Sequence, residues 1–163
     1  ARLCVVDVAP VGYRSEHEFG GYIAAMRRLD LGSLQRRAEA DAALAGAVPD
    51  QTVRSFLLQN LRHDHDGTVS TWRWQPNLEV LGDRLDVITD WPADELAGLP
   101  PYEGPVLWVR GERSTYVRDD DLPAMTALFP KVRRLTVKNA GHWVHSEQPE
   151  AFVGVLRAFL GDR

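Results

Sequence analysis

The chain has 163 residues, 44% of them apolar and 26% charged, a balance typical of a globular domain. The formal net charge is −4 and no long basic run occurs, so the composition indicates neither nucleic acid nor an anionic membrane as a partner. A single cysteine, Cys4, excludes an internal disulfide framework and a cysteine-based metal cluster.

The sequence carries no recognisable targeting or membrane-spanning segment. No apolar run approaches the ~20 residues that a transmembrane helix needs, and no secretory signal pattern is present. We therefore expect a cytoplasmic protein. The chain opens at Ala1 directly in a strand pattern, without an initiator methionine, so we also expect upstream residues and any targeting signal within them to be missing.

The first predicted element is a strand over residues 2–8, an apolar run interrupted by Asp7 and closed by Pro10. Runs of this kind fit strands that are buried on both faces of a parallel sheet. Helical spacing of apolar residues then predicts three helices, the second capped by Ser33 and the third by Asp50. They are expected at 16–29, 33–44 and 50–61.

A polar turn is predicted at 63–67, and Trp72–Trp74 alternates as an extended segment would. Helical spacing returns over 77–88, before a stretch punctuated by proline and glycine. The rest of the chain alternates strand, helix, strand and helix, at 106–110, 120–128, 133–137 and 149–160.

This alternation predicts an α/β fold with a mainly parallel sheet and right-handed crossovers. The helical stretch between the first two strands is too long for an ordinary crossover, so we interpret it as an inserted helical cap (lid). The sequence therefore predicts an α/β core formed by 1–12 and 101–163, and a cap over 13–100.

The clearest chemical motif is the loop after the last strand, where Gly141 precedes His142. Such a loop presents an imidazole at the C-terminal edge of a parallel sheet, where open α/β folds bind ligands. A neutral imidazole there suits a general base. A surface histidine without a role is the alternative, and His145 is better explained by packing or structural hydrogen bonding.

Asp7 is the first candidate for the acid that orients His142. A carboxylate in an apolar strand needs a partner, because burying it unpaired is costly, and a protonated histidine would be that partner. Glu112, in the loop after the second strand, is the alternative acid, although this position can point to solvent. A carboxylate that only caps the following turn is the remaining interpretation of Asp7.

Five segments together resemble the α/β-hydrolase superfamily, in particular its small acyl esterases and thioesterases of the bacterial and mitochondrial abhydrolase-domain type. The segments are 5–10, 54–61, 72–74, 110–117 and 140–145, and they extend over almost the whole chain. The resemblance implies the C-terminal half of the fold, from strand six through the cap to strands seven and eight. It also implies that Asp7 partners His142 and that Ser114 is an additional hydrogen-bonding member of the site.

No Gly-x-Ser-x-Gly nucleophile elbow occurs in the chain. The resemblance therefore implies that an N-terminal half, as a preceding segment or a separate chain, supplies the serine and the oxyanion donors. The expected reaction is hydrolysis of a small-molecule acyl ester or thioester, with no cofactor and no metal. The 163 residues alone are expected to be inactive. Four aromatic residues are the expected substrate walls: Tyr116, Trp143, Trp74 and Phe56.

Two other functions stay open at this point. The scaffold also suits dehalogenation, epoxide opening or perhydrolysis, which the identity of the nucleophile would separate from ester hydrolysis. A truncated, non-catalytic binding module is favoured by the missing elbow and disfavoured by the joint presence of Asp7, Ser114 and His142.

Two clusters have metal-ligand residue types. Asp119–Asp121 is explained more simply by negative charge at a helix N-terminus. His63–Asp66 is interpreted as part of a solvated turn, because no further ligand converges on it. We expect no metal at either.

Overall fold

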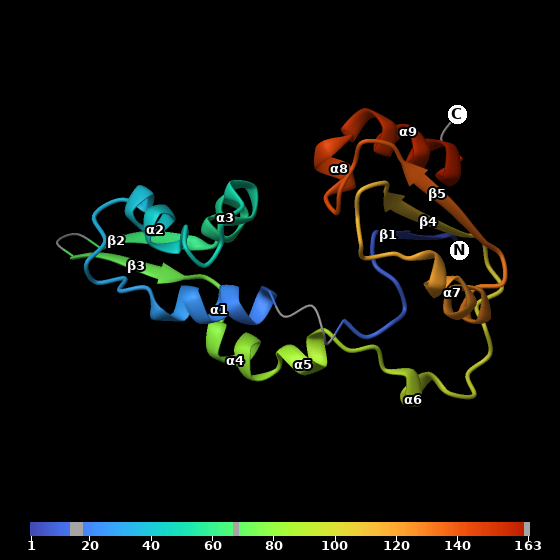
Figure 1. The fold of residues 1–163 in the computed structure, drawn as a ribbon, viewed down its shortest axis with the longest axis horizontal. Helices are drawn as coiled ribbons and strands as arrows, with labels where there is room; N and C mark the ends of the chain where they lie inside the picture. The colour runs from blue at the N-terminus through green and yellow to red at the C-terminus, as the bar shows by residue number, and fades with distance from the viewer. Residues whose placement is uncertain (14–17, 67–68, 162–163) are drawn as a thin grey trace. The chain divides into compact units, whose positions relative to one another are not determined.

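The computed structural model describes residues 1–13, 18–66 and 69–161 (Figure 1). The chain divides into two compact units. The sheet unit consists of Ala1–Gly12 with Trp91–Arg163, and the helical unit consists of Tyr13–Asp90.

The second boundary between the units differs from the predicted one, because residues 91–100 group with the sheet unit. This segment contains the single-turn helix α6 (Ala93–Leu96). It leads into Tyr102, whose N–H donates to the Leu128 carbonyl at 2.9 Å and whose hydroxyl donates to the Ala1 carbonyl at 2.7 Å. These bonds tie the end of the segment to the sheet unit.

The sheet unit is built on three parallel strands in the order β1 (Leu3–Val6), β4 (Val106–Gly111) and β5 (Val132–Val137). The central strand β4 is buried along almost its whole length. Its apolar run is what a parallel strand covered on both faces requires. The predicted α/β fold with a mainly parallel sheet is confirmed.

Helices lie on both sides of this sheet (Figure 1). On one side, α7 (Leu122–Leu128) follows a 3₁₀ turn (Asp119–Asp121), and Trp108 of β4 packs edge-on against Phe129 at a centroid distance of 5.6 Å. On the other side lie α8 (Val144–Glu147) and α9 (Pro149–Leu160). The apolar stripe of α9 packs against a core that includes Leu107 and Val109, through Phe152, Val155 and Phe159.

The helical unit begins with three helices, α1 (Glu18–Arg28), α2 (Arg37–Leu44) and α3 (Gln51–Leu58). An antiparallel hairpin follows, made of β2 (Leu61–Asp66) and β3 (Val69–Trp74), and then the short helices α4 (Leu78–Asp83) and α5 (Leu85–Ile88). The core of this unit is formed by Ala25, Met26, Ala40, Leu44, Leu58, Leu61 and Leu78.

The polar turn predicted at 63–67 is wrong for residues 63–66, which belong to strand β2; Gly67 lies outside the described residues. Cross-strand pairs explain the strand despite its polar sequence. His63 stacks on Trp72 at 4.2 Å, and Asp64 forms an ion pair with Arg73. Such pairs stabilise a two-stranded ribbon.

Of the two predicted N-caps, one is confirmed and the other is wrong. Asp50 is confirmed as the N-cap of α3, because its Oδ1 accepts the N–H groups of Thr52 at 2.7 Å and Val53 at 3.0 Å. Ser33 is wrong as a cap, since its hydroxyl donates to the Asp30 carbonyl at 2.9 Å and α2 begins only at Arg37. Among the described residues, no helix is long and apolar enough to span a bilayer.

Candidate active site

Asp7 lies at the C-terminal edge of the sheet, directly after β1. Its side chain is completely buried, and its backbone adopts a φ of 50°, in the left-handed region that non-glycine residues rarely enter. Its N–H donates to the Val109 carbonyl of β4 at 2.8 Å. Backbone strain of this kind persists only where the surrounding structure fixes it, and it is common at functional sites.

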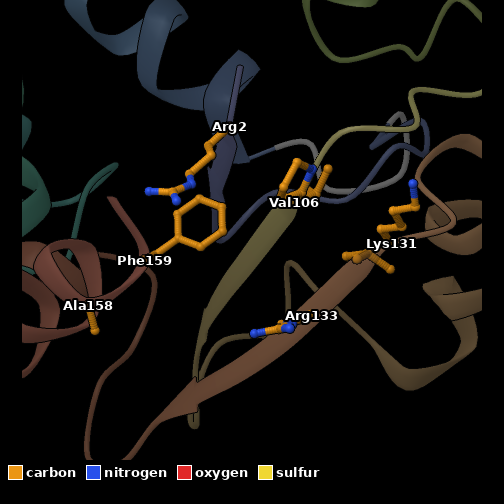
Figure 2. A pocket seen from close by; sticks show the side chains of 8 residues that line it. Arg2, Val106, Lys131, Arg133, Ala158 and Phe159 are labelled. Atoms are coloured by element: carbon orange, nitrogen blue, oxygen red, sulfur yellow. The ribbon is translucent and has the colours of Figure 1, made fainter. Parts of the chain in front are cut away.

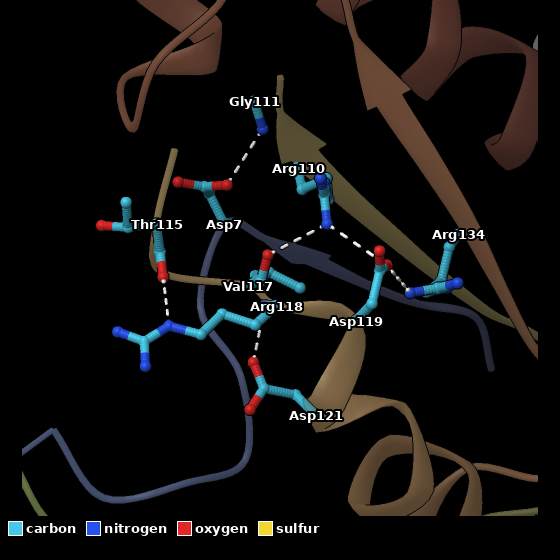
Figure 3. Close-up of polar contacts among 9 residues, drawn as sticks. All are labelled: Asp7, Arg110, Gly111, Thr115, Val117, Arg118, Asp119, Asp121 and Arg134. Carbon is cyan, nitrogen blue, oxygen red and sulfur yellow. Dashed lines mark hydrogen bonds and ion pairs between the residues drawn. The ribbon is translucent and has the colours of Figure 1, made fainter. Parts of the chain in front are cut away.

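The buried carboxylate of Asp7 is paired by three groups from two segments, the turn at the end of β4 and the loop after β5. The backbone N–H of Gly111, at the end of β4, donates to Oδ1 at 2.9 Å (Figure 3). The Ser114 hydroxyl donates to Oδ2, and Nδ1 of His142 lies 2.9 Å from the same oxygen. With its proton on Nδ1, His142 donates to Asp7 and leaves Nε2 free to accept another proton.

The loop that carries His142 follows β5 and packs tightly against the end of β4. A Cβ atom on Gly111 would lie 2.0 Å from the Gly141 carbonyl oxygen, so only glycine permits this approach. Ala140 and Val144 on either side are completely buried. The His142 side chain remains 43% exposed. The buried residues on either side thus fix the backbone of the loop, while the ring stays accessible at the edge of the sheet.

Three charged side chains brace this loop, and the sequence did not indicate their joint role. Glu112 accepts the N–H of Asn139 at 2.9 Å. Arg113 donates to the Asn139 carbonyl and to Glu147, both at 2.9 Å, and Glu147 accepts the N–H of Gly141 at 2.9 Å. Glu112, the alternative acid, therefore contacts the backbone of the histidine loop, whereas the imidazole pairs with Asp7.

Two of the predicted wall residues lie beside His142. Tyr116 stacks on the imidazole with a centroid distance of 4.0 Å and an interplanar angle of 22°. Its N–H also donates to the Ser114 hydroxyl oxygen at 3.2 Å. Trp143 follows His142 directly and is half-buried, and its carbonyl accepts the N–H groups of Ser146 and Glu147 in α8.

The other two predicted wall residues, Phe56 and Trp74, belong to the helical unit. The indole of Trp74 packs against the core of that unit and donates to the Met26 carbonyl at 3.0 Å. Phe56 lies on α3 with 51% of its surface exposed. The structure thus brings together Asp7, Ser114, Tyr116 and His142 as neighbours, and it shows Trp74 in a packing role.

Two of the three acids at 119–121 pair with arginine or with a backbone N–H (Figure 3). Asp119 lies 3.0 Å from Arg134 and 3.5 Å from Arg110, and Asp121 accepts the N–H of Arg118 at 2.7 Å. Within the described residues, no group of three or more histidine, cysteine, aspartate or glutamate side chains is placed to hold a metal ion.

A cavity of about 600 Å³ lies at the opposite, N-terminal end of the strands (Figure 2). It is bordered by the cations Arg2, Lys131 and Arg133 together with Phe159 and other apolar residues. None of the groups around His142 lines it. Because parallel sheets bind ligands at the carboxyl ends of their strands, we place the candidate site at the Asp7–His142 edge.

A family model described as the alpha/beta hydrolase fold matches residues 23–149. The chain belongs to this family. The predicted family is therefore confirmed, together with its fold.

Several curated relatives are named as lipases or esterases. The chain is 37% identical to the mouse (Mus musculus) sn-1-specific diacylglycerol lipase ABHD11, over 98% of the chain and 50% of that protein. It is 30% identical to the Escherichia coli esterase YbfF, over 99% of the chain and 58% of that protein. The chain thus spans about half the length of the curated relatives it matches.

A solved structure described as a marine microorganism esterase has a TM-score of 0.84 against the chain. It is 28% identical, with 97% of the chain and 60% of that structure covered. The three proteins named here are a lipase and two esterases, so ester hydrolysis is the chemistry that their names give for them.

Proposed function

We propose that this α/β-hydrolase chain supplies the general base and its carboxylate partner to a serine hydrolase that cleaves carboxylic esters or thioesters of acyl groups. The observation that carries the proposal is the pairing of a half-exposed imidazole with a completely buried carboxylate, Nδ1 of His142 lying 2.9 Å from Oδ2 of Asp7. The esterase and lipase relatives support the choice of an acyl substrate.

In the proposed reaction, Nε2 of His142 takes the proton of the serine hydroxyl while the serine oxygen attacks the acyl carbonyl carbon. Asp7 holds the ring in this tautomer and stabilises the imidazolium. The same proton then passes to the leaving alcohol or thiol, and an acyl-serine remains. A water molecule, activated by His142 in the same way, releases the carboxylic acid and restores the serine.

The Ser114 hydroxyl takes the lone-pair position of Asp7 Oδ2 that His142 does not use. It thereby helps keep the carboxylate in one orientation. With Gly111 on the other oxygen, Asp7 can rotate only by breaking several hydrogen bonds. This preorganisation is what a base that must act repeatedly requires.

We propose further that the serine and the oxyanion donors come from an N-terminal half of the same fold, as a preceding segment or a separate chain. The absence of Gly-x-Ser-x-Gly from the 163 residues supports this, as does the half-length match to the relatives. The helical unit is proposed to act as the cap, with Phe56 and Trp143 as acyl walls. Trp74 is proposed to stabilise the cap by packing against its core.

Covalent trapping tests this proposal. The chain is assembled with its N-terminal half and treated with a fluorophosphonate, and the labelled residue is identified by mass spectrometry. We expect a labelled serine in that half, with labelling abolished by His142→Ala and retained in His145→Ala. His145 is the matched control, since it lies on the following helix α8 and its ring centroid is 6.2 Å from that of Phe152.

The other outcomes are also decisive. No labelled serine, together with an aspartate at the nucleophile position of that half, would indicate dehalogenase or epoxide hydrolase chemistry on the same scaffold. Labelling of a serine that is unaffected by His142→Ala would remove His142 from the mechanism.

A further inference from the structure

We infer that Tyr116 is a positioning residue that fixes the plane of the His142 imidazole for proton transfer. The inference rests on the proposed function, and it assigns Tyr116 a role different from that of a substrate wall. The observation behind it is the stacked geometry, with ring centroids 4.0 Å apart and an angle of 22° between the planes.

The need for such a residue follows from how His142 is held. Its side-chain hydrogen bond joins Nδ1 to Asp7, and 43% of the side chain is exposed. One hydrogen bond fixes the direction of Nδ1 but leaves the ring able to rotate about the line from Nδ1 to the carboxylate oxygen. Rotation about that line moves Nε2 out of line with a nucleophile. A flat aromatic surface against the imidazole face opposes this rotation.

Tyr116 is suited to this task because its own backbone is tied to the same carboxylate. Its N–H donates to the Ser114 hydroxyl oxygen at 3.2 Å, and that hydroxyl donates to Asp7. Tyr116 thus contacts the face of the imidazole and Asp7 contacts its edge, and both residues are hydrogen-bonded to the Ser114 hydroxyl. A displacement of Asp7 and a displacement of the stacking surface are therefore coupled.

The segment that carries Tyr116 is anchored on both sides (Figure 3). The next residue, Val117, is only 2% exposed, and its carbonyl accepts the Arg110 guanidinium at 3.1 Å. The preceding Thr115 carbonyl accepts Nε of Arg118 at 3.2 Å. A stacking surface on so fixed a segment holds its partner in place, whereas a surface on a loose loop would follow it.

Kinetics on the assembled protein separate positioning from a wall role. We expect Tyr116→Leu and Tyr116→Met to lower kcat by about tenfold or more, since small misplacement of a catalytic group costs one to two orders of magnitude. The loss should be equal for acetyl, butyryl and hexanoyl esters, with KM nearly unchanged. Tyr116→Phe keeps the flat ring, so its kcat should stay close to that of the parent. Tyr116→Met keeps apolar bulk without a ring and is the matched comparison for folding.

Proton NMR gives a readout that does not depend on turnover. In the parent and in Tyr116→Phe, the His142 ring protons should carry a ring-current shift, and the low-field Nδ1–H signal should be sharp. Both features should be lost in the Leu and Met variants. Chemical shifts of His142 that are identical in all four proteins would overturn the inference.

A change in KM that grows with acyl length while kcat stays constant would also overturn it, because Tyr116 would then be a wall residue only. If the parent assembly hydrolyses none of these esters, the proposed function fails. The NMR comparison would then decide the positioning role alone.

Discussion

At the residue scale, Asp7 joins two features that each cost free energy by themselves, a buried carboxylate and a left-handed backbone. An unpaired buried carboxylate would be strongly destabilising, and the hydrogen bonds from Gly111, Ser114 and His142 remove that penalty. The left-handed turn ends β1 at the point where the carboxylate meets these donors. Strain and burial are therefore both consequences of one geometric requirement, a fixed acceptor for Nδ1 of His142.

The first prediction compares the two acids of the site. Asp7→Asn should reduce kcat/KM for an acyl ester by about three to four orders of magnitude, because an amide neither stabilises the imidazolium nor selects the tautomer. Glu112→Gln should cost less than about tenfold, since the amide oxygen still accepts the Asn139 N–H. Steady-state kinetics of both variants in the assembled protein would measure this. Equal losses would show that Glu112 acts in the reaction.

The residues that define the site differ in how visible they are in the sequence. Asp7 and His142 could be predicted because an acid in an apolar strand and a histidine after a glycine turn are local signals. Glu147 could not, because a glutamate in a short helix is unremarkable until the fold brings it to the Gly141 N–H. The stacking of Tyr116 on His142 likewise depends on two loops meeting in space.

At the element scale, the end of β4 and the histidine loop form one packed unit through Gly111 and Gly141. The second prediction follows from this packing. Gly111→Ala would place a Cβ atom 2.0 Å from the Gly141 carbonyl oxygen, a clash of backbone against side chain that cannot be relieved by rotamer change. We expect a loss of about 1–3 kcal/mol in the free energy of unfolding, together with a fall in activity as the loop moves.

Gly154→Ala is the matched control for this prediction. Gly154 lies within α9, and no heavy atom within 4 Å would meet the added Cβ. Alanine should stabilise the helix by about 0.5–1 kcal/mol. Chemical denaturation of both variants in the assembled protein measures the difference. A neutral Gly111→Ala variant would contradict the close packing of the loop.

Helix α3 supplies a pH-dependent prediction. Hydrogen bonds from the N–H groups of Val53 and Thr52 lower the pKa of the Asp50 carboxyl below its ordinary value. A group whose pKa is lower in the folded state stabilises that state above its unfolded pKa, and the contribution is lost as the pH falls through the folded pKa. Asp50→Ala should therefore destabilise the helical unit near neutral pH and much less in strong acid. Parallel denaturation series at several pH values would test this, with a pH-independent difference as the contrary result.

The elements themselves show which sequence signals sufficed. The apolar runs of β1 and β4 and the apolar stripe of α9 were predictable, because each keeps one sequence pattern over its full length. Strand β2 was not, since its polar residues are stabilised by partners across the hairpin, Trp72 and Arg73. The start of α2 was predicted wrongly because the Ser33 hydroxyl donates to the Asp30 carbonyl in a local turn and does not cap the helix.

At the scale of the whole molecule, both outer strands of the sheet unit, β1 and β5, have an edge without a strand partner in the described structure. β1 pairs with β4 on one side only, and Leu3 on it is 36% exposed. An apolar strand edge of this kind readily accepts another strand or aggregates. A three-stranded sheet also buries little surface to offset the ordering of a helical unit of similar size.

The last prediction is that residues 1–163 neither fold stably nor hydrolyse esters when expressed alone. We expect insoluble or molten material, recognisable by retained far-ultraviolet and lost near-ultraviolet circular dichroism. Co-expression with the N-terminal half should give soluble, cooperatively melting protein, because that half would pair with the free edge of β1 and bring a serine to about 3 Å from Nε2 of His142. A monodisperse monomer of the 163 residues that melts cooperatively would contradict the half-fold proposal. It would return the non-catalytic binding module to first place, since an intact Asp7–His142 pair without a nucleophile has no acyl chemistry to perform.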